Sequence, residues 1–241
     1  MQIHIYDHAT QAGQAGALLL AAQLLRKPDS VLGLATGSSP IPVYQELRRL
    51  YAAGIISFRQ AVSYNLDEYV GLAPDHPCSY HRFMQEELFD HVDMRPETIH
   101  VPDGLAADPD AAAAAYDRAI EAAGGIDLQL LGIGRNGHIG FNEPGDHFVG
   151  GCHVVDLTAS TIEANQRFFD SKDDVPRQAV SLGISAIAKA RTVLLIATGK
   201  EKAEAVRAAV RGEITPQVQA SILQTHPDVH FLLDRDAASL L

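Results

Sequence analysis

The sequence has little cysteine and no excess of basic residues. Its two cysteines, Cys78 and Cys152, are too few for a disulfide scaffold and suit a reducing cytosol. Lys and Arg number 19 against 30 Asp and Glu, so 19 − 30 gives a net charge of −11 with neutral histidine. This balance argues against a nucleic-acid-binding protein, because such a protein needs a basic surface.

Long hydrophobic runs are also missing. No apolar run approaches the ~20 residues of a membrane span, and the N-terminus lacks the basic and apolar regions of a signal peptide. The 241 residues are 46% hydrophobic and 20% charged, which is typical of a globular protein and excludes general disorder. Because single α/β domains can reach ~250 residues, we interpret residues 1–241 as one domain. We predict a cytoplasmic protein that binds neither nucleic acid nor membrane.

Short apolar segments alternate with helix-like segments along the chain. The runs 31–35 and 126–133 are the kind that is buried on both faces of a sheet. Further strands are expected at 3–5, 60–66, 154–155, 193–197 and 229–233, and helices at 9–27, around 43–50, and at 79–91, 108–123 and 200–211. This alternation predicts a doubly wound, mostly parallel α/β sheet, a Rossmann-like three-layer sandwich. Ligands of such sheets bind at the carboxyl ends of the strands.

A turn rich in glycine and hydroxyl groups follows the run 31–35. It reads Thr36-Gly37-Ser38-Ser39-Pro40, and a helix is expected to begin after it. Backbone N–H groups beside the positive end of a helix dipole suit a phosphate group. No Gly-Lys-Ser/Thr follows the turn, so a Walker A loop and a nucleoside triphosphate are disfavoured. An ordinary turn whose serine caps the helix is the alternative.

Two adjacent acids, Asp67 and Glu68, end the expected strand at 60–66. Asp67 lies between the apolar Leu66 and Tyr69, a suitable position for a general base at the carboxyl end of a strand. A solvated turn is the alternative explanation for such a pair.

The next strand runs into a glycine-rich loop. Gly132, Gly134 and Gly137 match the dinucleotide pattern G-x-G-x-x-G, and Asp156 lies 19 residues beyond Gly137. We reject this interpretation because the pattern should open a helix, whereas residues 140–151 are rich in glycine and show no helical apolar period.

The same loop carries His138 and, five residues later, Glu143. An imidazole exchanges protons near neutral pH and a carboxylate can orient it. Two cations, Arg167 and Lys202, could neutralise a phosphate through charge-assisted hydrogen bonds of ~1.5–3 kcal/mol each, although surface salt bridges are the alternative. The cysteines and histidines show no spacing typical of metal ligands, so no metal is predicted.

Four segments in this order resemble the glucosamine-6-phosphate deaminases: Leu34 to Pro40, Asn65 to Leu72, Gly132 to Pro144 and Asn165 to Phe169. The run Gly-His-Ile-Gly-Phe-Asn-Glu-Pro is the most specific of them. The resemblance extends from the first strand to Leu233. It implies conversion of glucosamine 6-phosphate and water to fructose 6-phosphate and ammonia, without a metal or an organic cofactor.

The resemblance also implies roles for individual residues. His138 would move the proton in ring opening, supported by Asn136 and Glu143. Asp67 would take the C2 proton and return it at C1 through an enolamine. The residues implied for the phosphate group are Thr36, Gly37, Ser38, Ser39, Arg167 and Lys202.

The sequence departs from the family pattern in two places. Many members have Asp where this chain has Asn136, so the imidazole would be oriented without that charge and the pH profile is expected to differ. Allosteric, hexameric members have a basic pair after the Glu-Pro and a longer tail, whereas here residues 150–155 are uncharged apart from His153 and the chain ends at Leu241. We expect a monomer or small homo-oligomer that N-acetylglucosamine 6-phosphate does not activate.

Two other functions and one hypothesis stay open. A 6-phosphogluconolactonase shares a similar Gly-His loop, but its usual continuation differs from Ile139 to Pro144, and it tends to carry Arg at the position of Tyr69. A non-catalytic sugar-phosphate sensor should carry a helix-turn-helix segment, for which a first strand expected at residue 2 leaves no room. The glycines and polar residues of 144–175 suggest a mobile lid, and equal hydrogen exchange with and without a sugar phosphate would contradict it.

Overall fold

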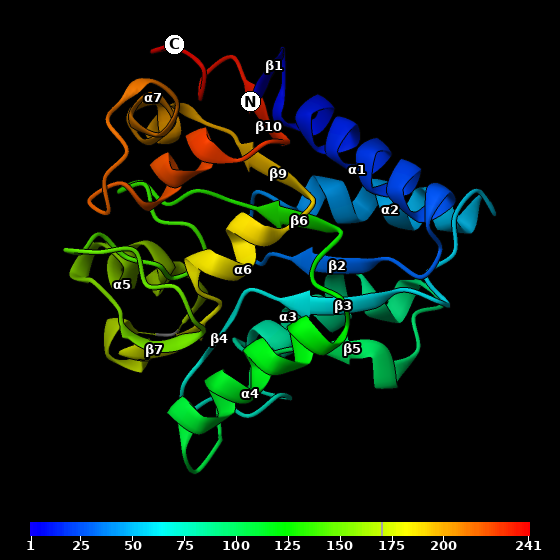
Figure 1. Ribbon diagram of the computed structural model, residues 1–241, viewed down its shortest axis with the longest axis horizontal. Coiled ribbons are helices and arrows are strands. Elements are labelled where there is room, and N and C mark those ends of the chain that lie inside the picture. Colours follow the sequence, from blue (N-terminus) through cyan, green and yellow to red (C-terminus); the bar gives the residue numbers. More distant parts are fainter. Residues whose placement is uncertain (170) are drawn as a thin grey trace.

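A parallel sheet of seven strands forms the centre of the computed structural model, which describes residues 1–169 and 171–241 (Figure 1). The strands follow the spatial order β1-β10-β9-β6-β2-β3-β5, and every neighbouring pair is parallel. Their bounds are β1 Gln2–Tyr6, β2 Val31–Leu34, β3 Val62–Asn65, β5 Ile99–His100, β6 Leu128–Leu131, β9 Thr192–Ala197 and β10 Val229–Asp234. The predicted doubly wound, mostly parallel α/β sheet is therefore confirmed.

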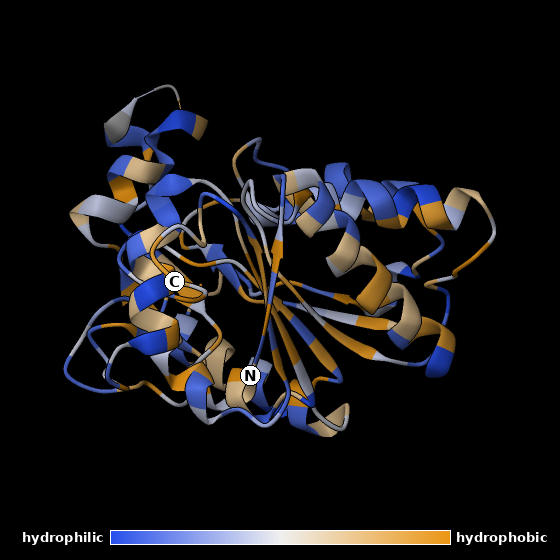
Figure 2. Ribbon diagram, turned by 90° about the horizontal axis from the view of Figure 1, so that it is seen from above, coloured by the Kyte–Doolittle hydropathy of each residue, from blue (hydrophilic) through white to orange (hydrophobic). Residues whose placement is uncertain are grey.

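Helices lie on both sides of this sheet, whose central strands are apolar (Figure 2). α1 packs against α2 and β10, while β2 and β6 are buried over their whole length. The helices are α1 Ala9–Arg26, α2 Ile41–Ala52, α3 Tyr80–Glu87, α4 Pro109–Ala122, α5 Ala159–Asn165, α6 Ile184–Lys189 and α7 Ala203–Arg211. Single 3₁₀ turns or short 3₁₀ helices are η1 Phe89–His91, η2 Pro96–Thr98, η3 Gln166–Phe168, η4 Lys172–Asp174, η5 Lys200–Lys202 and η6 Gln219–Thr225. The expected helices at 79–91 and 200–211 are thus each divided into an α-helix and a 3₁₀ turn.

The order of the strands sets the position of the site. From β2 the chain proceeds through β3 to β5 on one side, and then returns to β6 and continues through β9 to β10 on the other. β2 and β6 are neighbours at the point where the direction reverses. In open α/β sheets the crevice at the carboxyl ends of the strands on either side of such a point binds the ligand.

A second, antiparallel sheet of three strands has the order β4-β8-β7. β4 is Asp67–Tyr69, β7 is His153–Asp156 and β8 is Gln178–Ser181. The alternation of strands and helices predicted a parallel strand at 154–155, and this assignment was wrong because β7 pairs antiparallel with β8. β4, β5 and β8 were not predicted, since they are two to four residues long and have no apolar run of their own.

The chain crosses from one sheet to the other at Leu66. Its N–H donates to the carbonyl of Leu34 in β2 at 3.0 Å, and its carbonyl accepts from the N–H of Leu182 after β8 at 2.7 Å. Asp67 therefore begins a strand of the small sheet instead of ending one of the large sheet. Two backbone hydrogen bonds from different sheets thus fix the residue that precedes the candidate base.

A small separate core lies between the second sheet and the segment that includes α5. It contains the buried side chains of Tyr69, Phe141, Leu157, Ile162, Val175 and Ala179. The rings of Tyr80 and Phe141 stack beside it, with centroids 5.9 Å apart and planes 10° apart. This core holds the segment around α5 against the carboxyl ends of the main strands.

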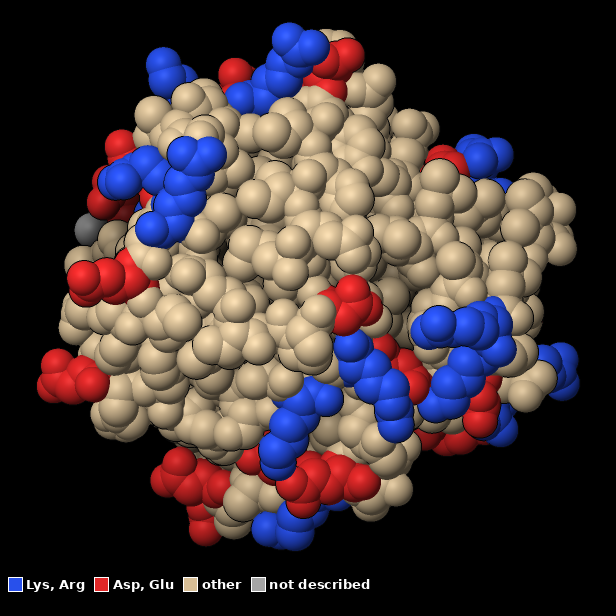
Figure 3. Space-filling view, turned by 45° about the horizontal axis from the view of Figure 1, so that its top comes forward, with Lys and Arg blue, Asp and Glu red and all other residues tan. Residues whose placement is uncertain are grey.

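Charged side chains of both signs are interspersed on the face shown in Figure 3, where Lys and Arg stand beside Asp and Glu. Examples of such pairs on the surface of the molecule are Arg235 with Asp7 and Arg207 with Glu204. Within the described residues no helix combines the length and the apolar character needed to cross a membrane.

Candidate active site

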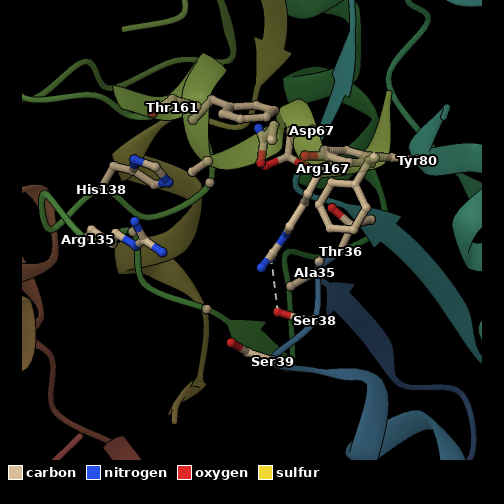
Figure 4. A pocket seen from close by; sticks show the side chains of 18 of the residues that line it. Ala35, Thr36, Ser38, Ser39, Asp67, Tyr80, Arg135, His138, Thr161 and Arg167 are labelled. Atoms are coloured by element: carbon tan, nitrogen blue, oxygen red, sulfur yellow. Dashed lines mark hydrogen bonds between the residues drawn. The ribbon is translucent and has the colours of Figure 1, made fainter. Parts of the chain in front are cut away.

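A cavity of about 690 Å³ opens at the carboxyl ends of β2, β3, β6 and β9. Its wall is formed by parts of the segments 35–39, 66–69, 77–83, 132–141, 160–169 and 198–202. Of the residues predicted for the site, all line this wall except Glu143, which lies behind His138. Sequence positions more than 160 residues apart, from Thr36 to Lys202, therefore meet in one cavity (Figure 4).

The turn after β2 offers backbone and hydroxyl groups to the cavity. Gly37 has φ +91°, a left-handed conformation that favours glycine, and nothing lies within 4 Å of where a Cβ would be. The alternative of a serine cap is wrong, because Pro40 is the N-cap of α2 and no side chain in the described part of the chain caps this helix. Ser38 instead accepts a hydrogen bond from the guanidinium of Arg167 at 3.3 Å, drawn in Figure 4.

Three cations approach this turn. Lys202 is half-buried and its Nζ donates to the carbonyl of Ile133 at 2.6 Å. Burial lowers the pKa of Lys202, and the charges of Arg135 and Arg167 lower it further, against an opposite effect of Glu201. The cluster of positive charge is therefore dense enough for its members to repel one another.

Arg135, the third of these cations, was not predicted from the sequence as a site residue. Figure 4 shows its guanidinium pointing into the cavity from the same loop as His138. It makes no hydrogen bond or ion pair with the rest of the described chain, whereas Arg167 and Lys202 each make a hydrogen bond. The available signal was a cation inside the glycine-rich loop, three residues before His138.

Asp67 is almost completely buried, with 6% of its surface exposed, and its Oδ1 has no hydrogen-bond partner among the described residues. Burial raises the pKa of Asp67 to about 8, and the nearby charge of Glu68 acts in the same direction, while the hydroxyl of Thr36 opposes them. Glu68 is also buried and accepts backbone N–H groups of Tyr69, Tyr80 and His81 at 2.8–2.9 Å. The alternative of a solvated turn is therefore wrong.

His138 faces the cavity with Glu143 behind it. The Nδ1 of His138 lies 3.3 Å from Oε2 of Glu143, and the Asn136 amide donates to that same oxygen at 2.8 Å. The backbone N–H of His138 donates to Oδ1 of Asn136 at 3.2 Å. Asn136 therefore supports the imidazole through Glu143 and through the backbone, and not by a direct bond to the ring.

Two threonines that were not predicted from the sequence hold the other oxygen of Glu143. Thr158 donates to Oε1 at 3.2 Å, and Thr161 makes a shorter hydrogen bond to the same atom. Burial would raise the pKa of Glu143, but hydrogen bonding and the charge interaction with His138, together with Thr161 and Asn136, lower it to about 2. Glu143 is therefore ionised and ready to orient the imidazole. The only local signal was that Thr158 caps α5.

Two glycines of the loop leave room for neighbouring side chains, Gly134 for His138 and Gly137 for Val218. A Cβ on Gly134 would lie 2.4 Å from the imidazole, and one on Gly137, at φ +86°, would lie 2.7 Å from Val218. No helix follows between β6 and β7, all of whose intervening residues are described, so the rejection of the dinucleotide pattern is confirmed. The described residues contain no group of three or more His, Cys, Asp or Glu placed to hold a metal ion.

Residues 7–231 match the sequence model of the family described as glucosamine-6-phosphate isomerases/6-phosphogluconolactonase. Over 241 residues, 100% of both chains, the chain is 51% identical to a glucosamine-6-phosphate deaminase of Halothermothrix orenii. It is 53% identical to that of Rhodopirellula baltica over 98% of this chain and 93% of the relative.

Solved structures agree with this similarity. One described as a monomeric glucosamine-6-phosphate deaminase has a TM-score of 0.98 at 44% identity, covering 100% of both chains. A 6-phosphogluconolactonase from Trypanosoma brucei has a TM-score of 0.78 at 20% identity, covering 100% of this chain and 98% of the other, and shows a shared fold alone.

Proposed function

Because the chain belongs to the family of glucosamine-6-phosphate isomerases and 6-phosphogluconolactonases, we propose that it is a glucosamine-6-phosphate deaminase. The reaction converts glucosamine 6-phosphate and water to fructose 6-phosphate and ammonia, a step in the breakdown of amino sugars. The observation that carries the proposal is a buried carboxylate, Asp67, facing the same cavity as the His138–Glu143 pair. An aldose–ketose isomerisation needs a base at C2 and a separate group for ring opening.

Ring opening is assigned to His138. Its imidazole would accept the proton of the C1 hydroxyl and a proton would be delivered to the ring oxygen, which leaves an open-chain aldehyde. Such a group must gain and lose a proton near neutral pH, as imidazole does. Glu143 would fix the ring orientation and stabilise the cationic form, while Thr158, Thr161 and Asn136 hold that carboxylate in place.

Isomerisation is assigned to Asp67. Its carboxylate would remove the C2 proton to give an enolamine and return the proton to C1. The C2 imine that results takes up water and releases ammonia, leaving the ketone of fructose 6-phosphate. Burial supports this role because a carboxylate without a water shell is a stronger base. Oδ1 has no hydrogen-bond partner within the described residues, which leaves that oxygen available to the substrate.

The phosphate group is assigned to the turn 36–39 and to the cations Arg135, Arg167 and Lys202. Binding energy from this remote group can hold the sugar in the reactive geometry at C1 and C2. The positive cluster, unusual in a chain of net charge −11, would be neutralised by a phosphate dianion.

The test is ammonia release from glucosamine 6-phosphate, coupled to detection of fructose 6-phosphate. Equal amounts of the two products would support the proposal. Hydrolysis of 6-phosphogluconolactone without ammonia release would favour the lactonase instead. Binding of sugar phosphate without turnover of either substrate would favour a sensor.

Replacing Arg135 by Ala is expected to raise KM for glucosamine 6-phosphate about tenfold and to leave kcat within about threefold. One charge-assisted hydrogen bond at an exposed site accounts for a loss of this size. Inhibition by inorganic phosphate should weaken in parallel. Arg59→Ala, an exposed arginine before β3 at the opposite end of the strands, is the matched control. An unchanged KM in Arg135→Ala would remove this residue from the phosphate site.

The activity of the free enzyme is expected to rise with pH as Asp67 ionises. The pKa of Asp67 is raised to about 8, and the base must be a carboxylate, so kcat/KM should increase through that pH. In the complex, a cationic substrate amine would favour the carboxylate, and the rise in kcat should lie at lower pH. Profiles from pH 5.5 to 9.5, corrected for titration of the substrate, would check this. A kcat/KM that is flat from about pH 6 to 9 would contradict it.

We also propose that N-acetylglucosamine 6-phosphate does not activate the enzyme. β7 begins at His153 and carries no Lys or Arg, unlike the basic pair expected of allosteric members. Adding this effector at subsaturating substrate should leave the rate unchanged, and a clear leftward shift of the saturation curve would refute the proposal. We further propose that residues 1–241 form one domain. The protein is a monomer or a small homo-oligomer and works in the cytoplasm.

The lid hypothesis for residues 144–175 stays a prediction. Residues 160–169 of that segment form part of the cavity wall, and Arg167 reaches across to Ser38. Residue 170 lies outside the described residues.

A further inference from the structure

The segment 216–220, which leads into η6, packs against the loop that carries His138 and Glu143. The N–H of Ala220 donates to the carbonyl of Gly137 at 2.9 Å, and the N–H of Gly145 donates to the carbonyl of Pro216 at 3.1 Å. Val218 fills the space beside Gly137, where a Cβ would clash at 2.7 Å. The loop is therefore held at both ends by one stretch of chain about 80 residues further on.

Gln219, the first residue of η6, reaches the backbone of Glu143. Its Nε2 donates to the carbonyl oxygens of Glu143 at 3.1 Å and of Pro216 at 2.9 Å. Both partners are acceptors only, so the orientation of the amide is fixed, with its NH₂ group towards them. Among the described residues, no other group donates to the carbonyl of Glu143, and the next residue, Pro144, has no N–H.

One half of the buried amide group of Gln219 reduces the stability of the folded protein. Gln219 is 2% exposed, and its Oε1 is buried without a hydrogen-bond partner in the described part of the chain. A buried amide oxygen without a partner opposes folding, and an apolar side chain of similar size would avoid that cost. The paired half of the amide is the half directed at the main chain of Glu143 and Pro216, while the unpaired half adds no stability.

We propose that Gln219 is a positioning residue for the deamination reaction, acting through Glu143. Thr158, Thr161 and Asn136 fix the carboxylate of Glu143, and Gln219 fixes its main chain. The carboxylate stays 3.3 Å from the imidazole of His138 only while both the side chain and the main chain of Glu143 are held in place. A displacement of this pair by a fraction of an ångström would slow ring opening, because proton transfer depends steeply on geometry. The inference rests on the proposed function.

The matched control is Gln224, the other glutamine of η6 whose amide donates to two backbone carbonyls. Its Nε2 binds the carbonyl oxygens of Ala209 at 3.0 Å and of Gly212 at 2.9 Å, which belong to α7 and its C-cap and not to the catalytic loop. Gln219→Leu and Gln224→Leu therefore remove the same number of hydrogen bonds of the same kind from the same short helix.

The experiment measures kcat and KM for glucosamine 6-phosphate, the melting temperature, and the affinity for glucitol 6-phosphate, an acyclic compound that needs no ring opening. Gln219→Leu should lower kcat about tenfold, with KM and the affinity for glucitol 6-phosphate within about twofold of wild type. Gln224→Leu should keep the wild-type kcat even where its melting temperature falls.

The variant Gln219→Glu distinguishes the loss of the two hydrogen bonds of this side chain from the loss of its packing. Its side chain has almost the same shape, but an ionised carboxylate cannot donate to the two carbonyls and is repelled by them, whereas a protonated carboxyl can donate to one. The ratio of its kcat to that of wild type should rise as the pH falls from about 9 to 6, in a protein that remains folded at both values.

Three results would overturn the inference. These are a wild-type kcat in Gln219→Leu, an equal loss of kcat in both leucine variants, and a Gln219→Glu ratio that does not change with pH. A wild-type protein that releases no ammonia would overturn the proposed function and this inference with it. Activity of the wild type together with any of the three results would overturn the inference alone.

Discussion

Asp67→Asn is expected to lower the kcat for ammonia release from glucosamine 6-phosphate by three to four orders of magnitude, on the order of the full contribution of a general base. The amide has the same shape but cannot accept the C2 proton. The measurement is the coupled assay of ammonia and fructose 6-phosphate. Asp75→Asn, which changes an exposed acid in the loop after β4, is the control and should keep the wild-type rate.

The stability of the same variant distinguishes lost chemistry from lost folding. The pKa of Asp67 in the folded protein, about 8, lies above its value of ~3.9 in an unfolded chain. The contribution of this group to stability is then fully present below about pH 4 and is lost as the pH rises through about 8. Asn does not ionise, so Asp67→Asn should melt no lower than wild type at pH 8. A retained kcat, within tenfold of wild type, would show that another residue is the base.

His138→Gln is expected to lower kcat by about two to three orders of magnitude, since ring opening loses its proton carrier while the isomerisation machinery stays intact. The residual reaction should depend on the spontaneous opening of the sugar ring in solution. Its rate should therefore stop increasing with enzyme concentration once that step limits it, whereas the rate of wild type remains proportional to enzyme.

The variant should still bind glucitol 6-phosphate with wild-type affinity, because neither the phosphate site nor Asp67 is altered. His147→Gln replaces an exposed histidine on the same loop and should behave as wild type. A residual rate that remains proportional to enzyme at all concentrations would contradict the assignment of His138 to ring opening.

Together the two variants test whether the steps before and after the open-chain aldehyde depend on different residues. Loss of Asp67 should block turnover however the aldehyde is formed, whereas loss of His138 should leave a rate set by the supply of aldehyde. This division of roles matches the structure, in which Asp67 begins β4 of the small sheet, His138 lies in the loop after β6 of the large sheet, and the two share no hydrogen-bond partner within the described residues.

Much of the fold could be predicted from local sequence. The apolar runs that became β2 and β6 are buried on both faces. The helix expected at 108–123 is α4, where Asp108 is the N-cap and accepts from the N–H of Ala111 at 3.0 Å. These signals are readable because burial of an apolar run and helix capping depend on residues within a few positions of one another. The three-stranded sheet was missed because β4 and β8 find each other across more than 100 residues.

Some features of the candidate site could likewise be predicted from local sequence, whereas others depend on the folded structure. Local sequence was enough to predict a turn rich in glycine and hydroxyl groups at 36–40, the glycine-rich loop after β6, and the presence of Asn136, His138 and Glu143 together in that loop. Three features became visible only in the folded chain: Thr158 and Thr161 hold Glu143, Arg135 joins Arg167 and Lys202, and Gln219 reaches the backbone of Glu143. The folded structure also decided the raised pKa of Asp67. The physical reason is that burial and electrostatic interactions depend on which distant segments are packed together, and no local pattern of residues records that packing.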